Sequence, residues 1–174
     1  MRVTGGKFKS RKLIYPKTKA TRPTSDMVKL AVFNMLDISS GVVLDLFAGS
    51  GSYGIEAISR GASFAYFIDY NQEAINVINE NIKALEIKNE TKVIKTTYEK
   101  FLKTNQTKFD YIFLDPPFDF KNYYNLINEL YLYLNDNGVI ILEVSKNFEL
   151  GDLEKYNTYK EKIYGNKKII ILHK

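Results

Sequence analysis

The sequence predicts an α/β protein built on a doubly wound, mostly parallel seven-stranded sheet that finishes in an antiparallel hairpin. From residue 41 onward, short apolar runs alternate with segments whose apolar residues recur every three or four positions. Near-continuous apolar strands of this kind are typical of a parallel sheet that helices cover on both faces. The alternation breaks near the C-terminus, where two strand patterns flank Gly165 and Asn166. These turn residues favour a β-hairpin.

The elements of this body follow one another in a regular order. The segment 71–85 shows the helical pattern most clearly, because its isoleucines and its last leucine fall on one face. We expect helices at residues 52–60, 71–85, 98–103 and 123–134, and strands at residues 42–46, 64–68, 92–95, 111–114, 139–143, 159–164 and 168–172.

A small extension is predicted in front of this body. Residues 1–15 contain two short extended pieces around a glycine turn, which indicates a β-hairpin. A helix is expected to begin at Ser25 or Asp26, since either side chain can cap free backbone N–H groups. We therefore divide the chain into an extension at 1–40 and one compact unit at 41–174. The apolar stripe of the extension's helix consists of Val28, Ala31, Val32, Met35 and Leu36.

Composition excludes several classes of protein. The 174 residues are 45% hydrophobic and 26% charged, which is ordinary for one soluble domain. There is no cysteine, so disulfides, thiolate metal sites and cysteine nucleophiles are excluded. No apolar run approaches the roughly 18 residues that span a bilayer, and the N-terminus lacks the apolar core of a signal peptide. We expect a cytoplasmic monomer with neither a membrane nor a metal partner.

Positive charge is concentrated at the N-terminus. The first 22 residues hold eight of the 25 lysines and arginines and none of the 20 acidic residues. A basic segment of this kind suits a phosphate backbone, although a solvated tail without a partner would have the same composition. The residues that we expect to contact RNA are Arg2, Lys7, Lys9, Arg11, Lys12 and Arg22.

A glycine-rich turn follows the first strand of the body. Gly49, Gly51 and Gly54 match GxGxxG and open the helix at 52–60. Ligands of doubly wound sheets bind outside the carboxyl ends of the strands. About 20 residues further on, Asp69 ends the next strand, where its two oxygens can accept hydrogen bonds from both hydroxyls of an adenosine ribose. The turn therefore predicts a nucleotide-like cofactor, against the alternative of an ordinary tight turn.

Asp45 favours a methyl donor over a dinucleotide at this turn. A carboxylate at the strand end attracts the amino group of a methionine moiety but repels a pyrophosphate. The chain also offers no second domain for a hydride acceptor. We expect S-adenosylmethionine, with contacts from Asp45, Phe47, Gly49, Ser50, Gly51 and Asp69.

The predicted strand at 111–114 runs into Asp115-Pro116-Pro117-Phe118. The prolines stiffen the loop and remove two N–H donors, so the carboxylate and the carbonyls form an acceptor-only site that matches an –NH₂ group. Phe118 offers a flat face on which a base can stack. These four residues are the predicted catalytic residues, and a rigid loop closing a strand is the alternative.

Methylation of a planar amine explains why such a loop is needed. The amine's lone pair is delocalised into the ring, and holding both N–H groups favours a tetrahedral nitrogen aimed at the methyl group. The product is acidic and loses its proton readily, so no strong base is required. The one histidine, His173, is accordingly expected to lie away from the chemistry.

Further motifs, spread over nearly the whole chain, resemble the RsmD-type family of bacterial 16S rRNA guanine-N2 methyltransferases. The cofactor turn and the Asp-Pro-Pro-Phe loop correspond closely to the family's motifs. The other matching segments are Met1-Arg2-Val3, Gly6-Lys7-Phe8, Arg11-Lys12-Leu13, Thr21-Arg22-Pro23-Thr24-Ser25-Asp26, Phe33-Asn34, Glu56-Ala57 and Ser59-Arg60-Gly61-Ala62.

The resemblance implies a class I (Rossmann-like) methyltransferase fold, S-adenosylmethionine as cofactor, and the exocyclic amine of a guanine in small-subunit rRNA as target. It also implies that the substrate is a partly assembled small ribosomal subunit. Thr97 stands where the family usually has an aspartate that holds the adenine amino group. We therefore add Thr97 and Tyr98 to the predicted cofactor contacts, with backbone groups carrying more of the recognition.

Two other functions remain open on the sequence. Adenine-N6 methyltransferases of DNA or RNA use the same tetrapeptide, and only the family-like N-terminus argues against that activity. A non-catalytic RNA-binding assembly factor of the same fold is the second alternative, which the intact Asp45, Asp69 and Asp115 disfavour.

Overall fold

The predicted alternation of strands and helices is present in the computed structural model, which describes residues 1–16, 26–151 and 153–174. The strands are β1 (Val42–Leu46), β2 (Phe64–Asp69), β3 (Thr91–Lys95), β4 (Phe109–Leu114), β5 (Leu134–Ser145), β6 (Thr158–Tyr164) and β7 (Lys167–His173). The helices are α1 (Asp26–Phe33), α2 (Ser52–Ser59), α3 (Gln72–Leu85), α4 (Tyr98–Thr104) and α5 (Tyr123–Leu130), with 3₁₀ turns η1 (Gly6–Phe8), η2 (Lys88–Glu90) and η3 (Tyr131–Tyr133).

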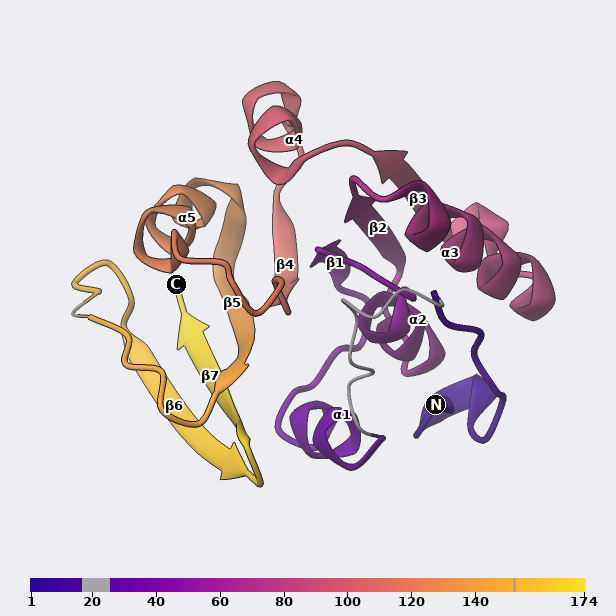
Figure 1. Ribbon diagram of the computed structural model, residues 1–174, viewed down its shortest axis with the longest axis horizontal. Coiled ribbons are helices and arrows are strands. Elements are labelled where there is room, and N and C mark those ends of the chain that lie inside the picture. Colours follow the sequence, from indigo (N-terminus) through magenta and orange to yellow (C-terminus); the bar gives the residue numbers. More distant parts are fainter. Residues whose placement is uncertain (17–25, 152) are drawn as a thin grey trace.

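The seven strands form one sheet in the order β3-β2-β1-β4-β5-β7-β6. β1 pairs in parallel with β2 and with β4, and β3 and β5 continue the parallel part on either side. β7 runs antiparallel to both β5 and β6, so the hairpin closes one edge of the sheet (Figure 1). The predicted doubly wound sheet and its C-terminal hairpin are confirmed.

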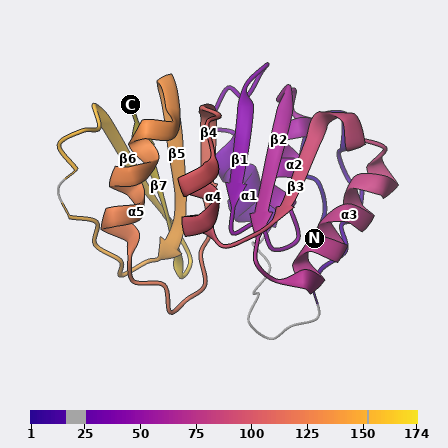
Figure 2. The ribbon, with the colours of Figure 1, turned by 90° about the horizontal axis from the view of Figure 1, so that it is seen from above.

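Helices cover both faces of the sheet, and each face has its own apolar core. Residues of α1, α2 and α3 pack with Val43 of β1 on one face. Residues of α4 and α5 pack with Leu44 and Leu46 on the other, because successive side chains of a strand point to opposite faces. Figure 2 shows α4 and α5 in front of the sheet and α1 and α2 behind it. None of the helices in the described part of the chain is long and apolar enough to cross a membrane.

Several boundaries differ from those predicted: α1 ends at Phe33, before Met35 and Leu36 of the predicted stripe, and the two largest differences are at the end of α5 and the start of β5. α5 ends at Leu130 and gives way to η3, whereas the sequence pattern suggested helix up to residue 134. β5 begins at Leu134 instead of residue 139, because Leu134 pairs with Phe109 ahead of an irregularity in the β4–β5 ladder. The early start of β5 arises from tertiary pairing that local periodicity does not encode.

The N-terminal extension is less regular than a two-stranded hairpin. Its ladder consists of one antiparallel bridge, Arg2 with Lys12, and the chain between them forms η1. Its apolar residues Val3 and Leu13 are buried in the same core as α1 and α2. The extension is therefore fixed to the body by packing rather than by strand pairing.

Polar contacts with α2 complete this attachment. The buried Glu56 carboxylate accepts hydrogen bonds from the backbone N–H and hydroxyl of Thr4, both at 2.7 Å. It also pairs with Arg60 at 2.8 Å and with the fully buried Lys29 at 3.5 Å. Burial lowers the pKa of Lys29, and the Glu56 charge opposes that shift. Glu56 thus links two parts of the extension, Thr4 and α1, to α2.

We predict that Glu56→Ala lowers the free energy of unfolding by about 3–5 kcal/mol, because it leaves the Lys29 ammonium buried without its counter-ion. Urea denaturation measures the change. The control is Glu90→Ala, which breaks a solvent-exposed pair with Lys7 and should cost less than about 1 kcal/mol. Equal losses in the two variants would contradict a stabilising role for the buried pair.

Candidate active site

The carboxyl ends of the parallel strands bring four acidic residues to one edge of the sheet. Asp45 lies in β1 and Asp69 ends β2. Asp115 follows β4 directly, and Glu143 lies near the end of β5. Because β1 pairs with both β2 and β4, Asp45 is opposite Phe67 on one side and Phe113 on the other. This is the edge at which doubly wound sheets bind their ligands.

The glycine-rich turn requires glycine for two different reasons. Gly49 has a φ of +56°, a left-handed conformation that L side chains rarely adopt, although space around it is open. Gly54 lies so close to β2 that an added Cβ would be 2.3 Å from the Phe67 ring. Phe47 also has a positive φ of 75°, and its backbone N–H donates to the Ile68 carbonyl at 3.1 Å. The turn is therefore a strained backbone held against β2.

Asp45 is buried beneath this turn. Its Oδ2 accepts a hydrogen bond from the Gly54 backbone N–H at 2.9 Å. Burial is the main cause that raises the pKa of Asp45 to about 8; the hydrogen bond from the Gly54 N–H opposes this rise, and the nearby charges of Asp115 and Asp69 contribute to it. The carboxyl is consequently protonated at neutral pH until a cation approaches it.

Asp69 connects the turn to the start of α3. Its Oδ2 accepts from the Gly49 N–H at 2.9 Å, and its Oδ1 accepts from the Asn71 N–H at 2.8 Å. Both oxygens are therefore held in place by backbone groups, and each carboxylate oxygen keeps capacity for a second hydrogen bond.

Thr97 and Tyr98 lie at the start of α4, beside the same edge. The exposed Thr97 caps the helix by accepting from the Lys100 N–H at 3.4 Å. The Tyr98 ring contacts Phe47 at 5.3 Å and Phe120 at 5.7 Å between centroids. The Thr97 hydroxyl is thus engaged with its own helix, and the turn and the Asp-Pro-Pro-Phe loop meet through aromatic contacts.

The residues of the Asp115–Phe118 loop differ in their exposure to solvent. The Asp115 side chain is 27% exposed, Pro116 is buried, and Phe118 is 97% exposed. The loop closes with a hydrogen bond from the Phe120 N–H to the Pro117 carbonyl at 2.9 Å. A solvent-exposed aromatic ring on a stiff loop is available for stacking with an incoming planar group.

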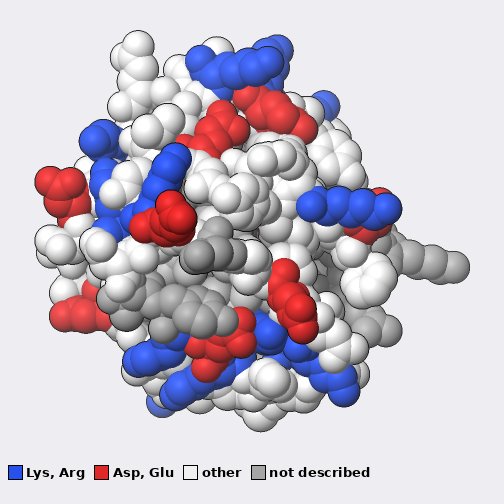
Figure 3. Space-filling view, turned by 90° about the vertical axis from the view of Figure 1, so that its left-hand side faces the viewer, with Lys and Arg blue, Asp and Glu red and all other residues white. Residues whose placement is uncertain are grey.

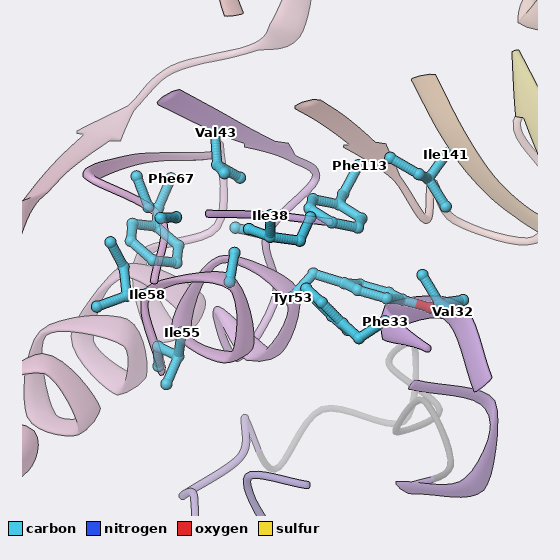
Figure 4. Packing of buried hydrophobic residues seen from close by; sticks show 14 of the residues in the cluster. Val32, Phe33, Ile38, Val43, Tyr53, Ile55, Ile58, Phe67, Phe113 and Ile141 are labelled. Atoms are coloured by element: carbon cyan, nitrogen blue, oxygen red, sulfur yellow. The ribbon is translucent and has the colours of Figure 1, made fainter. Parts of the chain in front are cut away.

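Three further residues at this edge were not identified from the sequence. The Tyr53 hydroxyl donates to Glu143 Oε2 at 2.6 Å, and Lys167 Nζ lies 2.8 Å from Glu143 Oε1. The Tyr53 ring stacks on the Phe113 ring, with 5.0 Å between centroids, and lies beside the Phe33 ring, with 6.2 Å between centroids (Figure 4). Glu143 could have been identified from the sequence, because it is a charged residue inside the apolar run 139–144. Lys167 could not, because only the hairpin brings it to this edge.

The predicted RNA contacts lie on the extension. Arg2, Lys9 and Lys12 are exposed, Lys7 pairs with Glu90, and Arg11 donates to the Ala84 carbonyl at 3.0 Å. Arg22 lies outside the described residues. On the face seen over the C-terminal hairpin, cationic and acidic side chains are interspersed (Figure 3).

His173 is far from the candidate site. It pairs with Val139 at the start of the β5–β7 ladder, whereas Lys167 pairs with Ser145 at the site end. No cluster of His, Asp and Glu suited to a metal ion occurs among the described residues.

Comparison with solved structures identifies the class of protein to which this fold belongs. The yhhF protein of Escherichia coli superposes with a TM-score of 0.86 at 29% identity, over 100% of this chain and 97% of that one. The T. thermophilus 16S rRNA N2 G1207 methyltransferase RsmC, solved with AdoMet and guanosine, has a TM-score of 0.75 over 91% of this chain and 45% of that one. Its identity of 19% makes that likeness one of fold. The fold is that of the class I (Rossmann-like) methyltransferases.

The family follows from sequence comparison. The model of a family described as "Conserved hypothetical protein 95" matches residues 1–173. The ribosomal RNA small subunit methyltransferase D of Haemophilus influenzae is 37% identical over 172 residues, which cover 95% of this chain and 89% of that protein. The chain belongs to this family, the RsmD-type methyltransferases, as the resemblance of its motifs predicted.

We predict that Asp45 makes the fold less stable as the pH rises. Its pKa is above the ordinary value of 3.8, so the folded state retains a proton that the unfolded chain loses, and stability falls between about pH 4 and pH 8, by at most about 1.4 kcal/mol per pH unit. Urea denaturation at several pH values measures this slope. Asp45→Asn should flatten it, whereas Asp136→Asn, at a largely exposed side chain, should not. An unchanged slope in Asp45→Asn would contradict the buried neutral carboxyl.

Proposed function

We propose that this protein uses S-adenosylmethionine to methylate the exocyclic N2 amine of a guanine in small-subunit ribosomal RNA. The observation that carries the proposal is the position of Asp115-Pro116-Pro117-Phe118 at the end of β4, next to the glycine-rich turn and Asp45 on the adjacent strand β1. The names of relatives such as the H. influenzae small subunit methyltransferase D support ribosomal RNA as the substrate.

The residues around the turn fit this cofactor. A buried, protonated Asp45 can ionise next to the methionine ammonium and so stabilise it. Asp69 is fixed by the Gly49 and Asn71 N–H groups, and its remaining acceptor capacity suits the ribose hydroxyls. The open space at Gly49 leaves the backbone accessible to a ligand. Phe47 and Tyr98 offer apolar ring surface for the adenine.

The acceptor loop would hold the target amine. The Asp115 carboxylate and the Pro116 carbonyl accept its two N–H groups, while the exposed Phe118 ring stacks on the base. Bound S-adenosylmethionine supplies the electrophilic methyl group. The amine nitrogen would take that methyl group, with S-adenosylhomocysteine as the leaving group, and would become cationic. Asp115 stabilises that charge and accepts the proton, which its partial exposure allows it to pass to water.

The target base must leave its stack to reach Phe118, as for other enzymes that modify bases. The exposed cations of the N-terminal extension are available to bind phosphates beside it. We propose that the assembling small subunit, rather than naked RNA, is the substrate. Localisation in the cytoplasm follows from that substrate.

We predict that purified small-subunit particles accept a labelled methyl group and that nucleoside digestion yields N2-methylguanosine. Asp115→Ala should abolish transfer while changing cofactor affinity less than about twofold, since Asp115 acts on the acceptor side. If the product is N6-methyladenosine instead, the target is adenine and the guanine-N2 proposal is wrong. No heat of S-adenosylmethionine binding in calorimetry would instead support a non-catalytic assembly factor.

We predict that Lys9→Ala/Lys12→Ala weakens RNA binding and reduces the slope of log K against log salt by about one to two. Both side chains are exposed on the extension. The matched control, Lys160→Ala/Lys162→Ala, removes the same charge from β6 and should leave the slope unchanged. Equal slopes in all three proteins would exclude the extension from the RNA interface.

A further inference from the structure

Lys167 lies between two carboxylates at the candidate site. Its Nζ is 2.8 Å from Glu143 Oε1 and 4.0 Å from Asp115 Oδ1. The side chains of Lys167 and Asp115 are 38% and 27% exposed, and that of Glu143 is 2% exposed. The Lys167 ammonium therefore lies between the buried Glu143 carboxylate and the Asp115 carboxylate, which is proposed to hold the target amine.

The buried end of this connection is rigid. Glu143 accepts from the Tyr53 hydroxyl at 2.6 Å, and the Tyr53 ring stacks on Phe113 at an interplanar angle of 14°. Phe113 is in β4, two residues before Asp115, so the Tyr53 ring packs on the strand that leads into Asp115. At the other end, the Lys146 N–H donates to the Asn166 carbonyl at 3.0 Å and fixes the hairpin next to Lys167.

Titratable groups from several elements surround Asp115. Asp45 on β1 and Glu143 on β5 are the nearby acids, and the Asp115 charge also acts on the hydroxyls of Tyr53 on α2 and Tyr123 on α5. Burial is the main cause that raises the pKa of Tyr123 to about 12, and the Asp115 charge adds to it. The same charge contributes to the raised pKa values of Asp45 and Tyr53. Like charges at such a site favour a shared proton, which would convert an acceptor into a donor.

We propose that Lys167 is a positioning residue that keeps Asp115 ionised and oriented as an acceptor for the target amine, by holding it against the Tyr53–Glu143 anchor. This inference rests on the proposed methyl transfer. Because its ammonium lies 4.0 Å from Asp115, Lys167 favours the ionised form of that carboxyl, which then stays an acceptor next to the nitrogen that becomes cationic. Lys167 therefore acts on the reaction through Asp115 and need not contact the base.

The test compares Lys167→Met with Lys167→Arg, which retains the positive charge. In Lys167→Met, kcat at neutral pH should fall roughly tenfold or more, and the acid limb of the pH–rate profile should move up by about one unit. Affinity for S-adenosylmethionine should stay within about twofold of the parent. Lys167→Arg should recover most of kcat and the parent profile. Lys162→Met, which removes an exposed lysine of the same hairpin, should match the parent.

Two outcomes would overturn the inference. If Lys167→Met and Lys167→Arg both lose kcat by the same factor at every pH, Lys167 has a packing role. Urea denaturation would then show a loss of stability in both variants. A parent-like profile in Lys167→Met would show that Asp115 does not depend on Lys167. Asp115→Asn separates this failure from failure of the proposed function: transfer that survives Asp115→Asn refutes the acceptor loop itself, whatever Lys167 does.

Discussion

The parallel pairing of β1 with both β2 and β4 is the constraint on which the rest of the molecule depends. It brings the ends of three buried strands to one edge, and Asp45, Asp69 and Asp115 meet there because each lies within one residue of the carboxyl end of its strand. The same pairing requires helices on both faces, since the strands expose apolar side chains in two directions. The two cores and the site thus have one origin.

Burial determines the chemistry of that edge. Asp45 is enclosed by the turn and the sheet, and its pKa rises to about 8 for that reason. Glu143 is equally enclosed but is compensated by Tyr53 and Lys167. Asp115, by contrast, is partly exposed on the proposed acceptor side. Residues with the same functional group therefore have three environments within one site, and these environments suit a cation-binding group, an anchor and an acceptor.

The N-terminal extension contacts α2, the same helix that begins at the glycine-rich turn of the candidate site. α2 begins at the glycine-rich turn, and Glu56 near its centre binds Thr4 of the extension and Lys29 of α1. Because the ion pair is buried, the extension has a fixed position relative to the turn. The glycine-rich turn and the basic N-terminal residues are therefore both attached to α2, so the proposed RNA contacts have a fixed position relative to the proposed cofactor site.

The sequence by itself determined the strand and helix order, the terminal hairpin, the glycine-rich turn around Gly49 and the position of Asp115-Pro116-Pro117-Phe118. These features are local, since periodicity, glycine and proline act within a few residues of chain. Only the tertiary structure decided the reduced N-terminal ladder, the early start of β5, and the group formed by Tyr53, Glu143 and Lys167. The last three lie on α2, β5 and β7, so their distances depend on sheet order and register, which no local pattern encodes.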